Sequence, residues 1–302
     1  MIDVSIIMVN YNTKELTRNC LKSVFEQTKD ITFEVIVSDN GSKDGSIDMI
    51  TKEFPQVILI ENNANLGFGA ANNRGLKIAK GKYVFYLNSD TVLLNNAVKL
   101  FFDHWENAKN KDDIGALEGV LLDEKGNNVL SGSTFPTTKS QFILCFKSFM
   151  YSSFLFKLFY SKMVLRFKKN KDEISTGAID FVCGADLFML NNENAKYDED
   201  FFMYFEETNM QYQLSKLGKR NFLIDAPKII HYGGASNPNT SYTYDFYKTT
   251  NIYFWESCLI YLKKNEMKYK SLYRFLCFIY LFIYCVLETL LNINLQEKDL
   301  ER

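Results

Sequence analysis

The sequence predicts an α/β protein: a doubly wound, mostly parallel sheet flanked by helices, with a C-terminal helical extension. The first reason is that short runs rich in β-branched and aromatic residues alternate with segments of helical periodicity through residues 1–120. The second is that most of these runs lack apolar–polar alternation, which is typical of strands buried on both faces of a parallel sheet. Right-handed βαβ units are therefore expected.

The expected strands are 4–9, 33–38, 57–60 and 83–87. A helix is expected after Thr13, whose hydroxyl can cap it, because Leu16, Cys20 and Val24 recur at helical spacing. Two further helices are expected at 70–79 and 95–105.

Composition excludes several classes of protein. With 47% hydrophobic residues in 302 positions, the chain can bury a large core, which excludes intrinsic disorder. Lys and Arg number 35 against 36 Asp and Glu, so no overall basic surface for nucleic acid exists. The six cysteines form no CxxC pair and indicate reduced thiols. The N-terminal residues lack a signal-peptide pattern, so we expect a cytoplasmic protein.

Two later segments allow more than one interpretation. The chain becomes aromatic and basic from about residue 135, which fits either core-packing helices or an amphipathic surface for a membrane or a lipid-linked substrate. Residues 272–292 are largely apolar, but their uninterrupted run, 275–287, is short for a membrane span. A packed or dimer-forming helix, an interfacial helix and a true span all remain open.

Four polar segments follow the four expected strands: 10–12, 39–44, 62–69 and 88–90. Each alone is compatible with ordinary turn chemistry. Together they lie at one sheet edge, where open α/β sheets bind ligands. Asp39 can accept the imide N–H of a uracil or thymine ring, and Gly67 and Gly69 would let the backbone approach a ligand. Asp90 suits a divalent cation that bridges two phosphates.

The motifs VSIIMVNYN, DNGSKDGS, NANLGFGAANNRG and YLNSD resemble the nucleotide-sugar domain of family-2 glycosyltransferases with the GT-A fold. The closest subgroup in pattern is the bacterial rhamnosyltransferase-like one. FVCGADLFML, YDEDFFMYFEETNMQYQLSKLGKR and IIHYGGAS continue the match in the expected order. The resemblance covers roughly residues 3–240, so we expect a GT-A domain over 1–240 and a helical region over 241–302. Within the domain, 1–120 would bind nucleotide-sugar and 121–240, with an insertion at 140–172, would serve acceptor and catalysis.

The resemblance implies a role for each matching residue. A divalent metal, Mg²⁺ or Mn²⁺, would be held by Asp90 and His231. The general base would be Glu207, with Glu206 as the fallback, because the family's usual aspartate is a glutamate at 207 and its third acidic position holds Asn209. The same two glutamates also fit a simple acidic helix start. The donor-binding residues implied are Asn10, Tyr11, Asn12, Asp39, Asn65, Gly67, Asn73 and Ser89.

The function implied is metal-assisted, inverting transfer of a sugar from dTDP-rhamnose or a UDP-sugar to a hydroxyl of a growing, lipid-linked bacterial surface glycan. Peripheral contact with the inner membrane face and a homodimer are left open. One alternative is a degenerate transferase that only binds donor or scaffolds an assembly complex, because Asn88 and Asn209 thin the carboxylate set. A sugar-1-phosphate nucleotidyltransferase is disfavoured, because NYNTKE after the first strand is not a glycine-rich phosphate loop.

Overall fold

The structure is a computed structural model that describes residues 1–129, 131–144, 176–233, 249–269, 271–275 and 278–279. The chain divides into two compact units, one formed by residues 1–135 and 173–241 and the other by 136–172 and 242–302. The first unit contains the sheet and every residue for which a role is implied.

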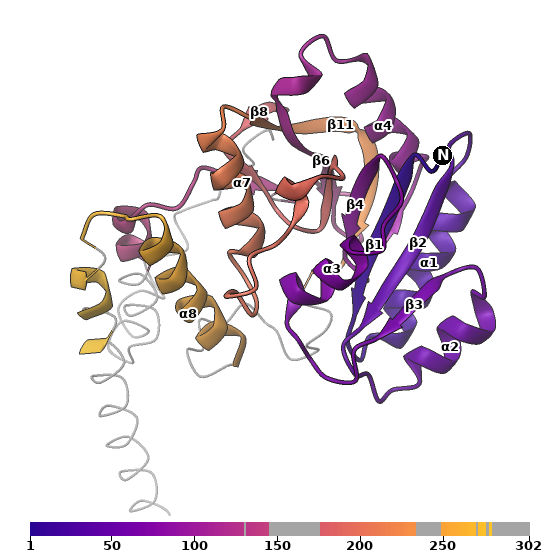
Figure 1. Cartoon of the computed structure of the whole chain (residues 1–302), viewed down its shortest axis with the longest axis horizontal. Helices are drawn as coiled ribbons and strands as arrows, with labels where there is room; N and C mark the ends of the chain where they lie inside the picture. Colours follow the sequence, from indigo (N-terminus) through magenta and orange to yellow (C-terminus); the bar gives the residue numbers. More distant parts are fainter. Residues whose placement is uncertain (130, 145–175, 234–248, 270, 276–277, 280–302) are drawn as a thin grey trace, which may run out of the picture. The chain divides into compact units, whose positions relative to one another are not determined.

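A nine-stranded sheet forms the centre of the first unit, in the order β3-β2-β1-β4-β10-β6-β11-β5, with β8 paired to β11 (Figure 1). Its strands are β1 (Val4–Asn10), β2 (Phe33–Asp39), β3 (Ile58–Glu61), β4 (Tyr83–Leu87), β5 (Thr91–Leu93), β6 (Ile114–Leu122), β8 (Gly177–Ile179), β10 (Asp186–Leu190) and β11 (Arg220–His231). A separate two-stranded sheet pairs β7 (Gly132–Ser133) with β9 (Phe181–Val182).

Strand direction confirms the expected α/β class. Strands β3, β2, β1 and β4 are parallel neighbours, and β6 is parallel to β11. Strand β10 runs antiparallel to both β4 and β6, while β5 and β8 run antiparallel to β11. The four strands expected from the sequence are all present, with ends within one residue of expectation.

Helices cover both faces of this sheet. They are α1 (Lys14–Gln27), α2 (Ser46–Glu53), α3 (Phe68–Leu76), α4 (Ala97–Asn107) and α7 (Glu206–Lys216). Cys20 of α1 contacts Met8, whereas a Cβ on Gly75 of α3 would meet Ile7. Because neighbouring strand residues point to opposite faces, α1 and α3 pack on opposite sides of β1.

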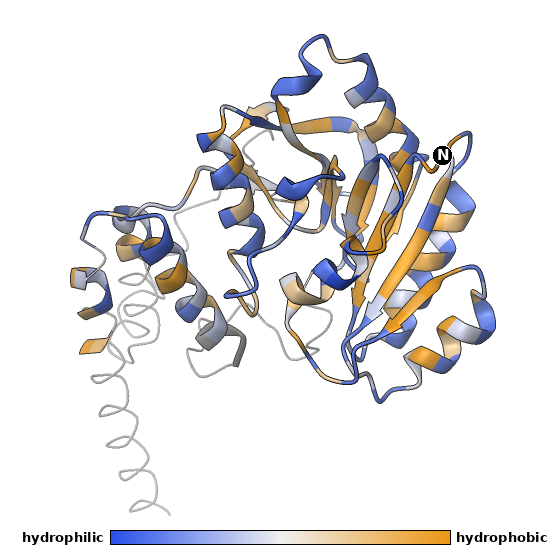
Figure 2. Cartoon of the chain, in the orientation of Figure 1, coloured by the Kyte–Doolittle hydropathy of each residue, from blue (hydrophilic) through white to orange (hydrophobic). Residues whose placement is uncertain are grey.

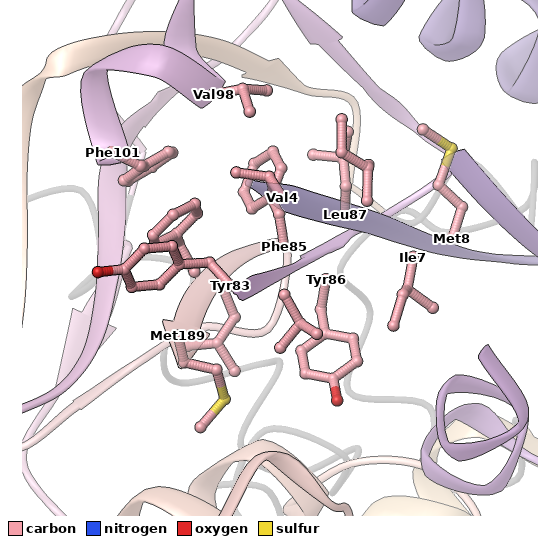
Figure 3. Packing of buried hydrophobic residues seen from close by; sticks show 14 of the residues in the cluster. Val4, Ile7, Met8, Tyr83, Phe85, Tyr86, Leu87, Val98, Phe101 and Met189 are labelled. Carbon is pink, nitrogen blue, oxygen red and sulfur yellow. The ribbon is translucent and has the colours of Figure 1, made fainter. Parts of the chain in front are cut away.

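The core lies between the sheet and these helices. Figure 2 shows apolar residues concentrated in the strands and polar residues on the outer helix faces. In Figure 3, Val4, Phe85 and Phe101 are among the side chains that meet from β1, β4 and α4. Phe101 stacks on Phe188 of β10 with ring centroids 5.5 Å apart. Burying one such ring contributes about 1.5–3 kcal/mol, so this cluster fixes the sheet that carries the polar strand ends.

The second unit is described here only in part. Helix α8 (Thr249–Lys264) buries Cys258 and Tyr261, and the Cys258 thiol lies 3.6 Å from both Gln141 Oε1 and the Tyr273 hydroxyl. No helix among the described residues is long and apolar enough to cross a membrane. The aromatic-basic stretch lies mostly outside the described residues, as does most of 272–292.

Candidate functional site

A cavity of about 400 Å³ opens at the carboxyl-terminal edge of the sheet in the first unit. It brings together residues from strand ends and from the start of α7: Val9, Tyr11, Thr13, Asn40, Asn65, Gly67, Phe68, Asn88, Ser89, Asp90, Cys183, Gly184, Ala185, Met203, Tyr204, Glu206, Glu207 and His231. Eight residues implied by the sequence line it: Tyr11, Asn65, Gly67, Ser89, Asp90, Glu206, Glu207 and His231. The other four implied residues, Asn10, Asn12, Asp39 and Asn73, lie outside its lining.

Asn10 organises the loops beside the cavity. It is fully buried, and its Nδ2 donates to Asp39 Oδ2 at 2.6 Å and to the Ser42 hydroxyl at 3.0 Å. Its Oδ1 accepts hydrogen bonds from the hydroxyls of Thr13 and Thr17 at 2.8 and 2.7 Å. An asparagine side chain offers two donors and two acceptor lone pairs, so none remains for a ligand. Asn10 therefore positions Asp39.

Asp39 is also fully buried, at the end of β2. Its Oδ1 accepts the backbone N–H groups of Gly41 and Ser42, and its Oδ2 accepts from Asn10. Ionised carboxylates accept about four hydrogen bonds, so one position on Oδ2 stays open. Asn12 links the same two loops, because its Oδ1 accepts the N–H of Lys43.

Thr13 occupies the position before α1, as expected, but its side chain makes no capping hydrogen bond. Its hydroxyl instead donates to Asn10 and lies 3.2 Å from the hydroxyl of Ser89. The expected capping by Thr13 is therefore wrong: the hydroxyl is directed toward Asn10 and not toward the first N–H groups of α1. The contact between the Thr13 and Ser89 hydroxyls connects the loop after β1 to the loop after β4 at the edge of the cavity.

The glycines after β3 lie against segment 197–202 of the protein. A Cβ on Gly67 would lie 2.3 Å from the carbonyl oxygen of Phe202, which also accepts the N–H of Phe68 at 2.9 Å. Gly67 has φ +86°, a conformation that favours glycine. A Cβ on Gly69 would lie 3.1 Å from the Tyr197 side chain. Both glycines let segment 197–202 pack closely, and Gly67 also lines the cavity, so its approach to a ligand stays a prediction.

Asn73 holds that same segment. Its Nδ2 donates to Tyr197 O and to Glu199 Oε1, both at 2.9 Å, and its Oδ1 accepts the N–H of Tyr197. Asn40, which the sequence did not single out, acts similarly across the cavity edge. It donates to Gly67 O at 3.1 Å and to Asn65 Oδ1 at 3.3 Å. Both asparagines therefore shape the cavity through the backbone.

Asp90 and His231 come together at the junction of β5 and β11, where His231 pairs with Thr91. Asp90 Oδ1 lies 3.3 Å from His231 Nε2. Burial lowers the pKa of His231, but the hydrogen bond and charge of Asp90 outweigh it and raise that pKa above its usual value.

These two side chains fit a divalent cation that also takes phosphate oxygens. Mg²⁺ commonly binds through one or two protein ligands plus substrate phosphates, not through an all-protein cage. Within the described ranges, no group of three or more His, Cys, Asp or Glu side chains is arranged to hold a metal alone. A carboxylate–imidazole pair on the cavity wall is thus a partial donor set that a diphosphate would complete.

Glu206 and Glu207 begin α7, directly after two residues with left-handed backbone. Tyr204 has φ +70° and Phe205 has φ +66°. Such conformations cost about 1–3 kcal/mol each and persist where the surroundings enforce them, often at functional sites. They turn the chain so that both glutamates enter the cavity lining.

Burial raises the pKa of both carboxyl groups, and in Glu206 the neighbouring charge of Glu207 adds to this effect. Glu206 Oε2 is buried without a hydrogen-bond partner. The Glu207 Oε1 accepts from the hydroxyl of Thr208 at 3.1 Å, which favours its ionised form. A carboxyl group with a raised pKa is suited to accept a proton near neutral pH.

Residues 183–185, between β9 and β10, form part of the cavity wall; we call them the floor segment. A Cβ on Gly184 would lie 3.3 Å from Cγ of Glu207. Just before the segment, Val182 exchanges two 2.8 Å hydrogen bonds with the Gln211 side chain of α7, and Ala185 O accepts the N–H of Asn88. Sequence reasoning missed these contacts; only the motif FVCGADLFML pointed to the region.

The sheet order and the cavity at its edge define a GT-A type α/β protein. Residues 5–159, more than half of the chain, match the profile described as Glycosyl transferase family 2. The chain belongs to glycosyl transferase family 2.

Similar proteins agree with this membership. A poly(ribitol-phosphate) beta-glucosyltransferase of Bacillus spizizenii is 31% identical over 122 residues, which is 39% of this chain and 19% of that protein. The UDP-Glc:alpha-D-GlcNAc-diphosphoundecaprenol beta-1,3-glucosyltransferase WfaP of Escherichia coli is 36% identical over 117 residues, 38% of this chain and 41% of that protein. The matches thus span less than half the length of either relative.

A solved structure of GalNAc-T7 with UDP, GalNAc and Mn²⁺ shares the fold. Its TM-score is 0.54 at 14% sequence identity, over 76% of this chain and 44% of that one. At this identity the likeness concerns the fold alone.

Proposed function

We propose that the protein is an inverting glycosyltransferase that moves a sugar from a nucleoside diphosphate donor to an acceptor hydroxyl. The observation that carries this proposal is that one cavity is lined both by the Asp90–His231 pair and by the two glutamates that begin α7. Transfer with inversion needs a site for the departing diphosphate and a base for the incoming hydroxyl. The cavity offers candidates for both.

The donor would bind at the strand ends. The open position on Asp39 Oδ2 would accept the imide N–H of a pyrimidine base, and the exposed Tyr11 side chain lines the adjoining cavity. Asn65 and Ser89 line the cavity and would contact the donor's polar groups. A UDP-sugar is supported by the name of the Escherichia coli relative, and dTDP-rhamnose by the motif pattern.

Asp90 and His231 would hold Mg²⁺ or Mn²⁺ together with diphosphate oxygens. When bound, the ion would neutralise charge that develops on the diphosphate as the sugar leaves. The protein's own part is to hold the carboxylate and imidazole 3.3 Å apart at a β5–β11 junction, so that both face the same ligand.

Glu207 would take the proton of the acceptor hydroxyl onto its carboxylate as the new glycosidic bond forms. Its raised pKa makes that transfer favourable near neutral pH. Gly184 lies beside its stem, and a Cβ at this position would be 3.3 Å from Glu207 Cγ, so a larger residue there would press on the proposed base. Glu206, buried with an unpartnered oxygen, remains the fallback base.

The acceptor we propose is a hydroxyl of a growing, lipid-linked bacterial surface glycan. The support is that the two curated relatives are named for poly(ribitol-phosphate) and for a diphosphoundecaprenol-linked sugar. Peripheral contact with the inner membrane face would then bring the enzyme to its acceptor.

The test is a thermal-shift panel of UDP- and dTDP-sugars, each with and without Mn²⁺. A ligand at a hundredfold excess over its Kd stabilises the folded state by about 2.7 kcal/mol, which gives a clear shift. We expect one nucleotide family to shift the melting temperature, and Mn²⁺ to increase that shift.

Asp90→Asn should remove the Mn²⁺-dependent part of the shift. The matched control is Asp112→Asn, which makes the same charge change at an exposed position and should behave as wild type. A folded protein that no donor stabilises would contradict the proposed donor site, and an Asp90→Asn variant with undiminished Mn²⁺ dependence would contradict the metal assignment.

A further inference from the structure

We propose that Glu118 and Asp186 form a carboxyl dyad that shares one proton, and that this dyad positions the floor segment 183–185 beneath Glu207. The first part concerns the fold of this chain alone. The second part rests on the proposed function, because it assigns the dyad to the placement of the proposed base.

The two side chains come from neighbouring central strands. Glu118 lies on β6 and Asp186 begins β10, which pairs with β6. Both are fully buried, and Asp186 Oδ2 accepts the N–H of Gly119, the residue that follows Glu118, so the two carboxyl groups are neighbours and each shifts the pKa of the other. Each carboxyl also accepts one backbone N–H: Glu118 Oε2 from Cys183 at 3.0 Å and Asp186 Oδ2 from Gly119 at 2.9 Å.

The second oxygen of each group is unpartnered. Glu118 Oε1 and Asp186 Oδ1 are both buried and lack a donor. Leaving two such oxygens bare in a sheet interior is costly, and two adjacent ionised carboxylates would also repel each other. A single proton held between these oxygens removes both penalties, because one group becomes a donor to the other. The arrangement requires no other residue.

Burial favours retention of that proton. It raises the pKa of Glu118 well above its ordinary value, and the negative charge of Asp186 adds to the effect. Burial also raises the pKa of Asp186, to about 7, while its contact with Glu118 and the more remote charge of His231 act in the opposite direction. The thiol of Cys183 has its pKa raised to about 12 by burial, with Asp186 and Glu207 contributing, so it stays neutral.

The dyad reaches the cavity through the floor segment. The N–H of Cys183 donates to Glu118 Oε2 and also to Ser131 O, both at 3.0 Å. Asp186 immediately follows Ala185, so the dyad holds both ends of the segment. Between them, Gly184 lies beside Glu207, whose Cγ would be 3.3 Å from a Cβ at this position. Loss of the proton would place two like charges at the dyad. Their repulsion would displace the floor segment and, with it, the side chain of Glu207.

Amide substitutions test this arrangement. In Glu118→Gln, the amide oxygen can keep the Cys183 N–H while the amide nitrogen donates permanently to Asp186, and Asp186→Asn is equivalent in reverse. Either single variant therefore mimics the protonated dyad at every pH. The double variant places two NH₂ groups face to face with no acceptor between them. We expect each single variant to fold. We expect the double variant to lose more stability than the sum of the two single losses.

The first measurement is urea unfolding of the full chain across about pH 5 to 9 for the four proteins and the exposed control Glu124→Gln. A carboxyl whose pKa is raised by folding binds its proton in the folded state, so stability falls as pH rises above the unfolded value. One proton contributes about a tenfold change in the folding equilibrium per pH unit. We expect Glu118→Gln to flatten this dependence and Glu124→Gln not to. Equal slopes in wild type and Glu118→Gln, or additive effects in the double variant, would overturn the dyad.

The second measurement is hydrogen exchange of the floor segment, compared between proteins at the same pH. Wild type should exchange the amide of Cys183 faster than Glu118→Gln at alkaline pH and at the same rate at acid pH. The alkaline fall in donor turnover should likewise be smaller in Glu118→Gln. Identical exchange at all pH values would overturn the positioning role. Absence of turnover in every protein would count against the proposed function, whereas unfolding and exchange would still decide the dyad.

Discussion

The two sides of the cavity treat their buried carboxyl groups in opposite ways. At the end of β2, Asp39 is surrounded by three N–H donors, and Asn10 beside it uses all of its hydrogen-bonding capacity. At the start of α7, Glu206 keeps a buried oxygen without a partner and follows two residues with positive φ. The first side has nearly all of its hydrogen-bonding positions filled, with one left open on Asp39 Oδ2. The second side keeps a buried oxygen without a partner next to a strained turn.

Under the proposed function, this difference would separate donor binding from proton transfer. A satisfied network keeps its shape without a ligand, which suits recognition of a rigid base. A strained pair of carboxyl groups has raised pKa values, which suits proton transfer. Substitutions on either side should remove the hydrogen-bonded network of one side, remove the raised carboxyl pKa of the other, or reduce the difference between them.

The largest effect is expected for Glu207→Gln. An amide cannot accept the acceptor's proton, and a general base contributes about 100- to 10,000-fold to a rate. We expect turnover of the donor to fall by that range in a coupled assay for nucleoside diphosphate release, while donor binding by calorimetry stays unchanged. Glu124→Gln is the control. Undiminished turnover would transfer the role to Glu206, and Glu206→Gln would then have to show the loss.

Asn10→Asp should break the satisfied side. The new carboxylate would face Asp39 where a 2.6 Å hydrogen bond now stands, and the two threonine hydroxyls alone cannot offset the repulsion. Disrupting a buried charged network of this kind costs about 3–5 kcal/mol. Chemical denaturation should show this loss, together with weaker donor binding. The same substitution at exposed Asn110 should change neither, and a fully stable Asn10→Asp protein would refute the role given to Asn10.

Gly184→Ala should have a smaller, more selective effect. Its Cβ would press on Cγ of Glu207 at 3.3 Å, so the glutamate must move by a few tenths of an ångström. A shift of that size should lower kcat by roughly tenfold or less. Because the donor side is untouched, the KM for donor should not change. A parallel rise in KM would mean that the floor segment contacts the donor directly.

The pH dependence of turnover and of stability should show the smallest effect of the difference between the two sides of the cavity. The base must be ionised to act, and burial raises the pKa of Glu207, so turnover should fall as pH drops through a value above the ordinary glutamate figure of about 4.3. The same raised pKa makes folding less favourable as pH rises through this window. In Glu207→Gln, the urea midpoint should therefore decline less as pH rises. A turnover that falls only near the ordinary glutamate pKa would contradict the raised pKa of Glu207.

The sequence predicted the strands and the polar strand ends well, because both depend on local patterns. β4 is a run of five buried residues, and Asp90 comes shortly after it. Asp39 is the last residue of β2. The functions of Gly67 and Asn73 were not predictable, because their partners, Phe202 and Tyr197, lie more than 120 residues away in the chain. Glu118 and Asp186 are also distant in the chain, which hid their proximity. Local chemistry identified which residues were unusual, and only the fold showed what they touch.

The paired hydrogen bonds between Gln211 and Val182 have a mechanical consequence. A carboxamide that both donates to and accepts from one backbone residue imitates a neighbouring strand, so α7 is attached to β9 much as one strand is attached to another. The helix that carries both glutamates is therefore joined to the residue directly before the floor segment by hydrogen bonds of the kind that hold strands in register. A substitution at Gln211 would act on both walls of the cavity at once.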